Sequence, residues 1–173
     1  MERYHPVSAG LHWLTATLVI ALIALALFDQ PLEKALGTSS IRLHKSLGMT
    51  VFGLTLLRIV WRLRHRAPPL PESTGRMQRA AAWAVHLLLY GFLLGLPLLG
   101  YVLSSGGPYP MHWFGIAVAK LPVSKSVGDA AAALHVWGGY AMIALLGMHI
   151  AAALHHQFVV RDRLILRMLP AIR

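Results

Sequence analysis

Four long apolar segments are the feature that most constrains how this chain can fold. They cover residues 11–28, 47–63, 80–103 and 130–160. Each segment, as a helix, is long enough to cross the ~30 Å hydrocarbon core of a bilayer, where backbone polar groups must pair within the helix. Hydrophobic residues make up 57% of the chain and charged residues only 13%, well below the share in soluble domains. The sequence therefore predicts an all-α integral membrane four-helix bundle, with residues 1–173 as a single transmembrane domain.

The excess of basic residues predicts the orientation of this bundle. The chain has 16 lysines and arginines against 6 acidic residues, but they lie between the apolar segments and form no continuous basic face, which argues against nucleic acid as a partner. Five lie in the first and third connections, at Lys34, Arg42, Lys45, Lys120 and Lys125. The other eleven lie in the N-terminus, the middle connection and the C-terminal tail: Arg3, Arg58, Arg62, Arg64, Arg66, Arg76, Arg79, Arg161, Arg163, Arg167 and Arg173. The positive-inside rule then predicts that both termini are cytoplasmic.

Histidines recur inside the apolar segments at matched depths. His135 and His149 are fourteen residues apart on the fourth segment. On one helix they point within ~40° of each other and lie ~21 Å apart along the axis. With the predicted topology, His44 and His135 share a level near the outer side of the membrane. His12 and His149 share a level near the cytoplasmic side, with His86 as an open alternative there.

Paired imidazoles at one level of a bundle favour bis-histidine ligation of a haem iron. Nearby glycines at positions 48, 138, 139 and 147 leave room for a flat macrocycle, although glycine also serves plain helix packing in membranes. A structural histidine bonded to a neighbouring helix, a zinc site and an ion pathway are the alternatives. Zinc usually takes three or four close ligands, and ion pathways usually contain carboxylates or lysines. The chain has no cysteine, and the four segments contain no acidic residue, so haem is favoured.

Four stretches of the sequence together resemble the prokaryotic cytochrome b561 family over nearly the whole chain. They are "RYHPVSAGLHWLTATLVIALIAL", "IRLHKSLGMTVFGLTLLRIVWRLRHRAPPLP", "HLLLYGFLLGLPLLGYVLS" and "LHVWGGYAMIALLGMHIAAALHHQFVVRDRLILRMLP". The resemblance implies two haem b groups in a bacterial inner-membrane protein that exchanges electrons with ubiquinone. It implies that His12 and His149 bind the inner haem, and that His44 and His135 bind the outer haem. His86 matches a further family histidine that is not needed as a ligand.

Members of this family have been assigned as superoxide:ubiquinone oxidoreductases, and similar bundles serve as cytochrome subunits of dehydrogenases and hydrogenases. We therefore expect an oxidoreductase, similar to a superoxide oxidase, that moves electrons between a periplasmic donor and the membrane quinone pool. The donor is superoxide or a periplasmic redox protein. Two other classes stay open: a non-catalytic cytochrome b subunit that anchors a separate periplasmic redox partner, and a histidine-linked bundle without cofactor.

Four further residues are candidates for roles beside the haems. His86 and His155 lie near the inner level and could donate a hydrogen bond and a proton to a quinone. A backbone carbonyl or a haem propionate is the alternative partner of His86. Arg42 and Lys45 flank His44 and could steer a small anion to the outer haem. Interfacial anchoring in the lipid headgroups is the alternative role for these two cations.

Overall fold

The computed structural model describes residues 3–37, 39–69 and 74–169, so Arg173 of the charge count lies outside the described residues. Four long helices dominate the chain: α1 (Pro6–Leu27), α3 (Ser40–Arg64), α4 (Arg76–Gly106) and α5 (Lys125–His155). A π-helical turn, η1 (His156–Val160), continues α5, and a 3-10 turn, η2 (Ile165–Met168), follows it. All four long helices have the length and hydropathy of membrane spans, and this confirms the predicted bundle. They extend beyond the predicted apolar segments because their polar end turns are helical too.

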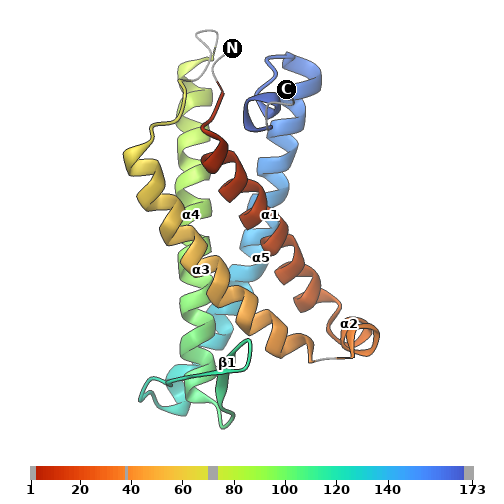
Figure 1. The fold of residues 1–173 in the computed structure, drawn as a ribbon, viewed down its shortest axis with the longest axis vertical. Coiled ribbons are helices and arrows are strands. Elements are labelled where there is room, and N and C mark those ends of the chain that lie inside the picture. Colours follow the sequence, from red (N-terminus) through yellow and green to blue (C-terminus); the bar gives the residue numbers. More distant parts are fainter. Residues whose placement is uncertain (1–2, 38, 70–73, 170–173) are drawn as a thin grey trace.

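The two ends of the bundle are clearly different (Figure 1). In this view α1 and α3 cross in front of α4 and α5. The most extensive packing joins α4 to α5, followed by α1 to α3 and α3 to α4. The backbone N–H of Tyr4 donates to the carbonyl of Arg167 over 3.1 Å, so the first and last described segments meet at one end. We call this end the terminal end, and the opposite end, which carries α2 (Asp29–Leu36) and a β-hairpin, the hairpin end.

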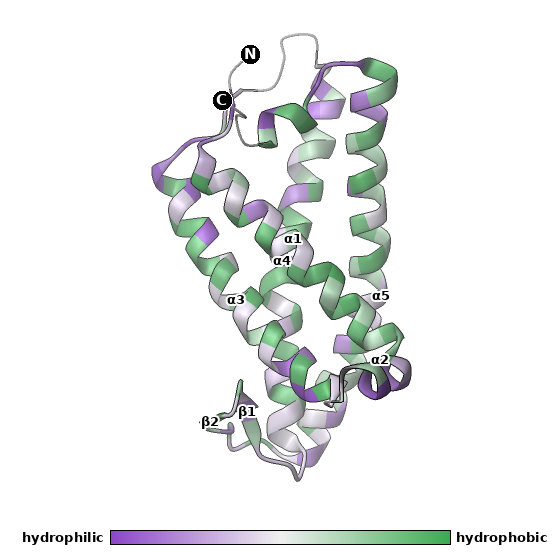
Figure 2. Cartoon of the chain, turned by 45° about the vertical axis from the view of Figure 1, so that its right-hand side comes forward, coloured by the Kyte–Doolittle hydropathy of each residue, from purple (hydrophilic) through white to green (hydrophobic). Residues whose placement is uncertain are grey.

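The surface of the long helices suits a hydrocarbon environment. Large apolar side chains such as Leu57, Leu88, Trp137 and Met148 are exposed along them. Hydrophobic residues follow the middle of the helices in Figure 2, and hydrophilic residues gather towards the two ends. A water-soluble bundle would bury such residues, so the outward apolar faces are placed to contact lipid.

One residue from each long helix forms the buried centre of the bundle. These are Val19 of α1, Val51 of α3, Leu93 of α4 and Met142 of α5, and we call them the central layer. Partly buried leucines and Phe92 pack around them. The central layer fixes how the four helices are aligned along the bundle axis. A residue seven positions from it lies two helical turns, or ~10.5 Å, towards one end or the other.

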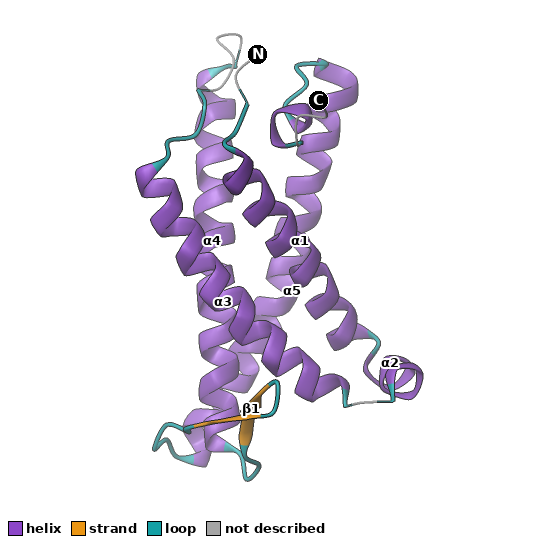
Figure 3. Ribbon diagram, in the orientation of Figure 1, coloured by secondary structure: helices purple, strands orange, loops and turns teal. Residues whose placement is uncertain are grey.

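The connections at the hairpin end contain more structure than the sequence predicted. The first connection forms α2, and α3 begins at Ser40, so Arg42 and Lys45 lie in the first turns of a long helix instead of a loop. The third connection forms an antiparallel hairpin of β1 (Met111–Trp113) and β2 (Ile116–Val118), drawn as strands in Figure 3. Its two-residue turn has positive φ at Phe114 and Gly115, as such tight hairpins require.

Two hydrogen bonds hold this hairpin against α3. The Trp113 indole N–H donates to Thr50 Oγ1 over 3.1 Å, and the Phe114 backbone N–H donates to Ser46 Oγ over 3.1 Å. Both acceptors lie on α3, one helical turn apart. The hairpin therefore lies beside the hairpin-end turns of α3. These turns also carry His44.

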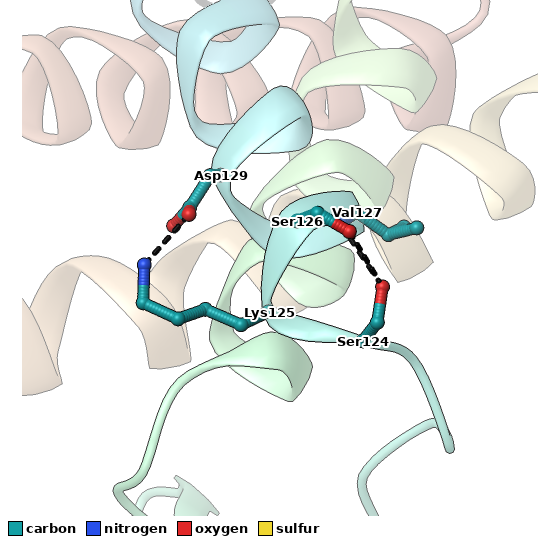
Figure 4. A network of polar contacts seen from close by, with 5 residues as sticks. All are labelled: Ser124, Lys125, Ser126, Val127 and Asp129. Carbon is teal, nitrogen blue, oxygen red and sulfur yellow. Dashed lines mark hydrogen bonds and ion pairs between the residues drawn. The ribbon is translucent and has the colours of Figure 1, made fainter.

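The first turn of α5 is capped, and it starts in close contact with the end of α4. Ser124 Oγ accepts a hydrogen bond from the Val127 N–H, and an exposed ion pair of 2.7 Å joins Lys125 to Asp129 (Figure 4). A Cβ atom added at Gly106 would lie 2.8 Å from the Cα of Gly128. These two glycines allow the backbones of α4 and α5 to touch at the hairpin end.

Candidate functional site

The histidines of the apolar segments form two layers at equal distances from the central layer. Seven residues from the central layer, towards the hairpin end, lie Ala26, His44, Gly100 and His135. Seven residues towards the terminal end lie His12, Arg58, His86 and His149. We call these the hairpin-end layer and the terminal-end layer. Each takes one residue from every long helix.

In the hairpin-end layer, two histidines face each other across the bundle. The ring centroids of His44 and His135 are 6.1 Å apart. His44 Nδ1 lies 3.1 Å from the carbonyl of Leu22, and His135 Nδ1 lies 2.9 Å from the carbonyl of Leu96. A carbonyl only accepts, so each neutral ring carries its proton on Nδ1 and keeps the Nε2 lone pair. This is the tautomer that a metal ligand bound through Nε2 requires.

A cavity of about 530 Å³ opens beside this histidine pair. Its lining comes from all four long helices and is mainly apolar, with both His44 and His135 in the wall. The cavity exists partly because the other two members of the layer, Ala26 and Gly100, have little or no side chain. A Cβ atom at Gly100 would lie 3.2 Å from Cε1 of His135, so the glycine lets the imidazole lie directly against α4.

The four glycines that the sequence analysis placed near the histidines fall into two groups. Gly48 and Gly139 line the cavity, and a Cβ atom at either would meet nothing within 4 Å. Gly147 also faces open space. Gly138 has a packing role instead, because a Cβ atom there would lie 2.8 Å from Leu96 Cδ2 of the neighbouring helix. The room expected for a flat ring is therefore present around His44 and His135, while Gly138 serves helix contact.

The dimensions of the hairpin-end layer fit a bis-histidine haem. Two imidazoles bound to one first-row metal ion through ~2.0 Å bonds have ring centroids ~6.3 Å apart. The observed separation of 6.1 Å agrees with this. A mainly apolar cavity of several hundred cubic ångströms is typical of cofactor sites. Within the described ranges, no group of three or more His, Asp or Glu side chains could hold a metal ion by itself.

The terminal-end layer brings three histidines together. The ring of His149 lies 6.5 Å from that of His12 and 5.6 Å from that of His86, measured between centroids. The separation of His12 and His149 is closer to the ~6.3 Å expected for two imidazoles bound to one iron. His86 Nδ1 lies 2.6 Å from the carbonyl of Ala82 in its own helix, so a backbone carbonyl is the partner that the structure gives it. Both His12 and His86 therefore lie beside His149. The sequence had offered these two histidines as alternative partners at this level.

The fourth member of the terminal-end layer is Arg58, which the charge count placed in the middle connection. The structure corrects this: Arg58 lies inside α3, and its Nη2 donates to His12 Nδ1 over 3.1 Å. Its guanidinium also lies over the ring of Tyr90, 5.4 Å from the centroid. The spacing in the sequence pointed to this position of Arg58. Arg58 follows Val51 by seven residues, and His44 precedes Val51 by the same number.

The remaining candidate residues differ in how they lie relative to the two histidine pairs. His155 is exposed at the end of α5, and its one ring contact among the described residues is with His156. Arg42 is exposed on α3. Lys45 lines the hairpin-end cavity, but Asp29 lines it too, so the charged residues in this wall are one cation and one anion.

Comparisons with known proteins identify the family to which this chain belongs. The family model of prokaryotic cytochrome b561 matches residues 3–171. The chain is 36% identical over 174 residues to "Cytochrome b561 homolog 2" of Escherichia coli K12, covering 97% of this chain and 92% of that protein. It is 27% identical to "Probable superoxide oxidase CybB" of Yersinia pestis over 99% of this chain and 98% of the relative. It is also 30% identical to "Cytochrome b562" of Cereibacter sphaeroides over 96% and 94% of the two chains. The chain therefore belongs to the prokaryotic cytochrome b561 family, and it is a multi-pass bacterial membrane cytochrome of the b type that acts in electron transfer.

Proposed function

We propose that this chain is a dihaem oxidoreductase of the bacterial inner membrane that passes electrons between a periplasmic donor and ubiquinone. One observation carries the proposal: two cross-bundle histidine pairs lie on layers equally far from the central layer, with ring separations of 6.1 and 6.5 Å. In this proposal both termini are cytoplasmic, so the hairpin end faces the periplasm. The excess of arginine at the terminal end supports that orientation.

The residues of each layer have a defined part in such a protein. A bound haem b supplies a one-electron carrier at its layer. His44 and His135 hold an iron through Nε2, and the carbonyls of Leu22 and Leu96 fix their rings. His12 and His149 hold the iron of the terminal-end layer, where Arg58 instead of a backbone carbonyl contacts Nδ1 of His12. The two layers are fourteen residues apart on α5, or ~21 Å along the axis, and the central layer fills the space between them with apolar side chains.

We assign quinone binding to the terminal end, with His86 as the group that donates a hydrogen bond and a proton. The ring of His86 lies 5.6 Å from that of His149, which supports its position beside the haem of that layer. Because the Nδ1 proton of His86 is directed at the Ala82 carbonyl, the ring donates a hydrogen bond and a proton from Nε2 in its doubly protonated form. His155 has less support as a second donor, because it is exposed and contacts His156 instead of the layer.

The donor that we propose at the hairpin end is superoxide. The name of the Yersinia pestis relative, a probable superoxide oxidase, supports this choice. Lys45 in the cavity wall would attract a small anion, with Arg42 one turn away adding to the field, and Asp29 in the same wall would weaken this attraction. The attraction is therefore expected to be modest and to fall with salt.

A second candidate function is that of a membrane anchor for a separate redox protein. The large apolar side chains exposed on and beside the hairpin favour it. Phe114 and Ile116 are 56% and 62% exposed, and Tyr109 beside them is 76% exposed. Such a patch suits a docked periplasmic redox protein, for which this chain would be the membrane anchor. The two functions differ in what the purified chain does alone. A superoxide-driven reduction of quinone by this chain without a partner would support the enzyme, and its absence with both haems still reducible by dithionite would support the anchor.

The experiment that tests the proposal is a haem count on the purified protein. Extraction into alkaline pyridine should give two non-covalent haem b per chain, because no cysteine is present for covalent attachment. One haem or none would refute the two-layer assignment. His135→Ala should then remove one haem and His149→Ala the other.

A further inference from the structure

Arg58 is a half-buried cation without a carboxylate partner in the described residues. It lies in the terminal-end layer, and the ion pairs found in the described ranges are Lys125–Asp129 and His156–Asp162, which do not involve it. Its hydrogen bond to His12 and its position over Tyr90 satisfy part of the guanidinium. An arginine partly withdrawn from water without an anion is unfavourable, so the position of Arg58 suggests that an anion binds beside it.

The side chains around Arg58 offer mostly hydrogen-bond donors. The hydroxyl of Tyr90 is buried and has no hydrogen-bond partner within the described part of the chain. A small cavity of about 20 Å³, enough for a water molecule or a pair of oxygen atoms, is lined by Arg58, Tyr90 and Arg62 among others. Trp61 in the same wall already donates its indole N–H to Ser8 Oγ. The ligand that fits such a site is small, negatively charged and rich in acceptor oxygens, as a carboxylate is.

The bond between Arg58 and His12 cannot persist once His12 binds an iron through Nε2. A guanidinium only donates, so in this bond His12 Nδ1 accepts, and the ring proton lies on Nε2. Ligation through Nε2 moves the proton of a neutral ring to Nδ1, where two donors would face each other. Arg58 must then find a new acceptor nearby.

We propose that Arg58 and the Tyr90 hydroxyl together bind a propionate carboxylate of the haem held by the terminal-end layer. This inference rests on the proposed function, which supplies the haem. Arg58 thus has two positions: on His12 when the layer is empty, and on the carboxylate when it is filled. The bidentate geometry of arginine suits the two carboxylate oxygens, and the phenol adds a third donor.

The test compares three variants of the haem-loaded protein. Arg58→Gln and Tyr90→Phe should each shift the propionate bending band in the resonance Raman spectrum. Arg58→Gln should in addition lower the midpoint potential of one haem and leave the other unchanged, because a cation beside the ring favours the reduced form. Arg64→Gln is the matched control, since it removes the same charge from an exposed position on the same helix. The control should leave both the band and the potentials unchanged.

Several results would overturn the inference. Unchanged propionate bands and potentials in Arg58→Gln, with both haems present, would refute it. A weaker apparent affinity for an added short-chain ubiquinone with those spectra unchanged would place a quinone carbonyl at Arg58 instead. If Arg58→Gln fails to retain the haem, Arg58→Lys and Tyr90→Phe decide the matter through the same band, which must shift in both. Failure of the proposed function is seen separately, as fewer than two haems in the unmodified protein.

Discussion

Replacing Gly100 with leucine should remove one haem and spare the other. Gly100 belongs to the hairpin-end layer, and even a Cβ atom there would lie 3.2 Å from Cε1 and 3.4 Å from Nδ1 of His135. The three further carbons of leucine would enter the cavity or push the imidazole away from Leu96. Overpacking of this kind costs about 1–3 kcal/mol. If that cost falls on the haem-bound protein, the affinity for haem at this layer falls by about fivefold to 150-fold.

The matched control is Gly91→Leu, which makes the same change on the same helix. A Cβ atom at Gly91 meets nothing within 4 Å, and Gly91 lies in neither cavity wall. The measurements are the pyridine haemochrome count and a potentiometric titration of the reduced-minus-oxidised spectrum. Gly100→Leu should purify with about half the haem per chain and a single redox component, while Gly91→Leu keeps two. A Gly100→Leu protein with two haems and unchanged potentials would refute the claim that Gly100 makes room for a haem in the hairpin-end layer.

Three further predictions test other parts of the account. His86→Ala should keep both haems and slow quinone reduction, whereas loss of the terminal-end haem would assign His86 as its ligand in place of His12. Lys45→Gln should lower superoxide-driven reduction and flatten its dependence on salt, since charges are screened over ~10 Å at 0.1 M; an unchanged salt dependence would exclude steering by this residue. Thr50→Val removes the acceptor of the Trp113 indole and should raise hydrogen exchange in the hairpin by about fivefold, for a bond of about 1 kcal/mol; unaltered exchange would mean that other contacts hold the hairpin.

The sequence predicted the spans and the histidine levels because both depend on simple periodic rules. An apolar run of spanning length has few alternatives to a membrane helix. The spacing of His135 and His149 fixes their common direction once they lie on one helix. The structure shows these two residues in separate layers, each beside a histidine from another helix.

Other parts of the site depend on how the helices are aligned against each other, which composition does not reveal. The need for glycine at position 100 becomes clear only from the structure, which places the His135 ring directly against α4. Arg58 was counted as a loop residue because it lies near the basic end of its segment, and its contact with His12 spans forty-six positions. Counting seven residues from a buried position on every helix would have found both. The hairpin escaped prediction because its strands are three residues long and are held by contacts to α3.

The measurement that tests the central claim most directly is the haem content of one variant from each layer. His135→Ala and His149→Ala are compared with the unmodified protein by pyridine haemochrome and by potentiometric titration. We predict two haems in the unmodified protein and one in each variant, with the component that is lost in one variant retained in the other. Loss of the same component from both variants, or of both components from either, would contradict two independent haem sites on separate histidine layers.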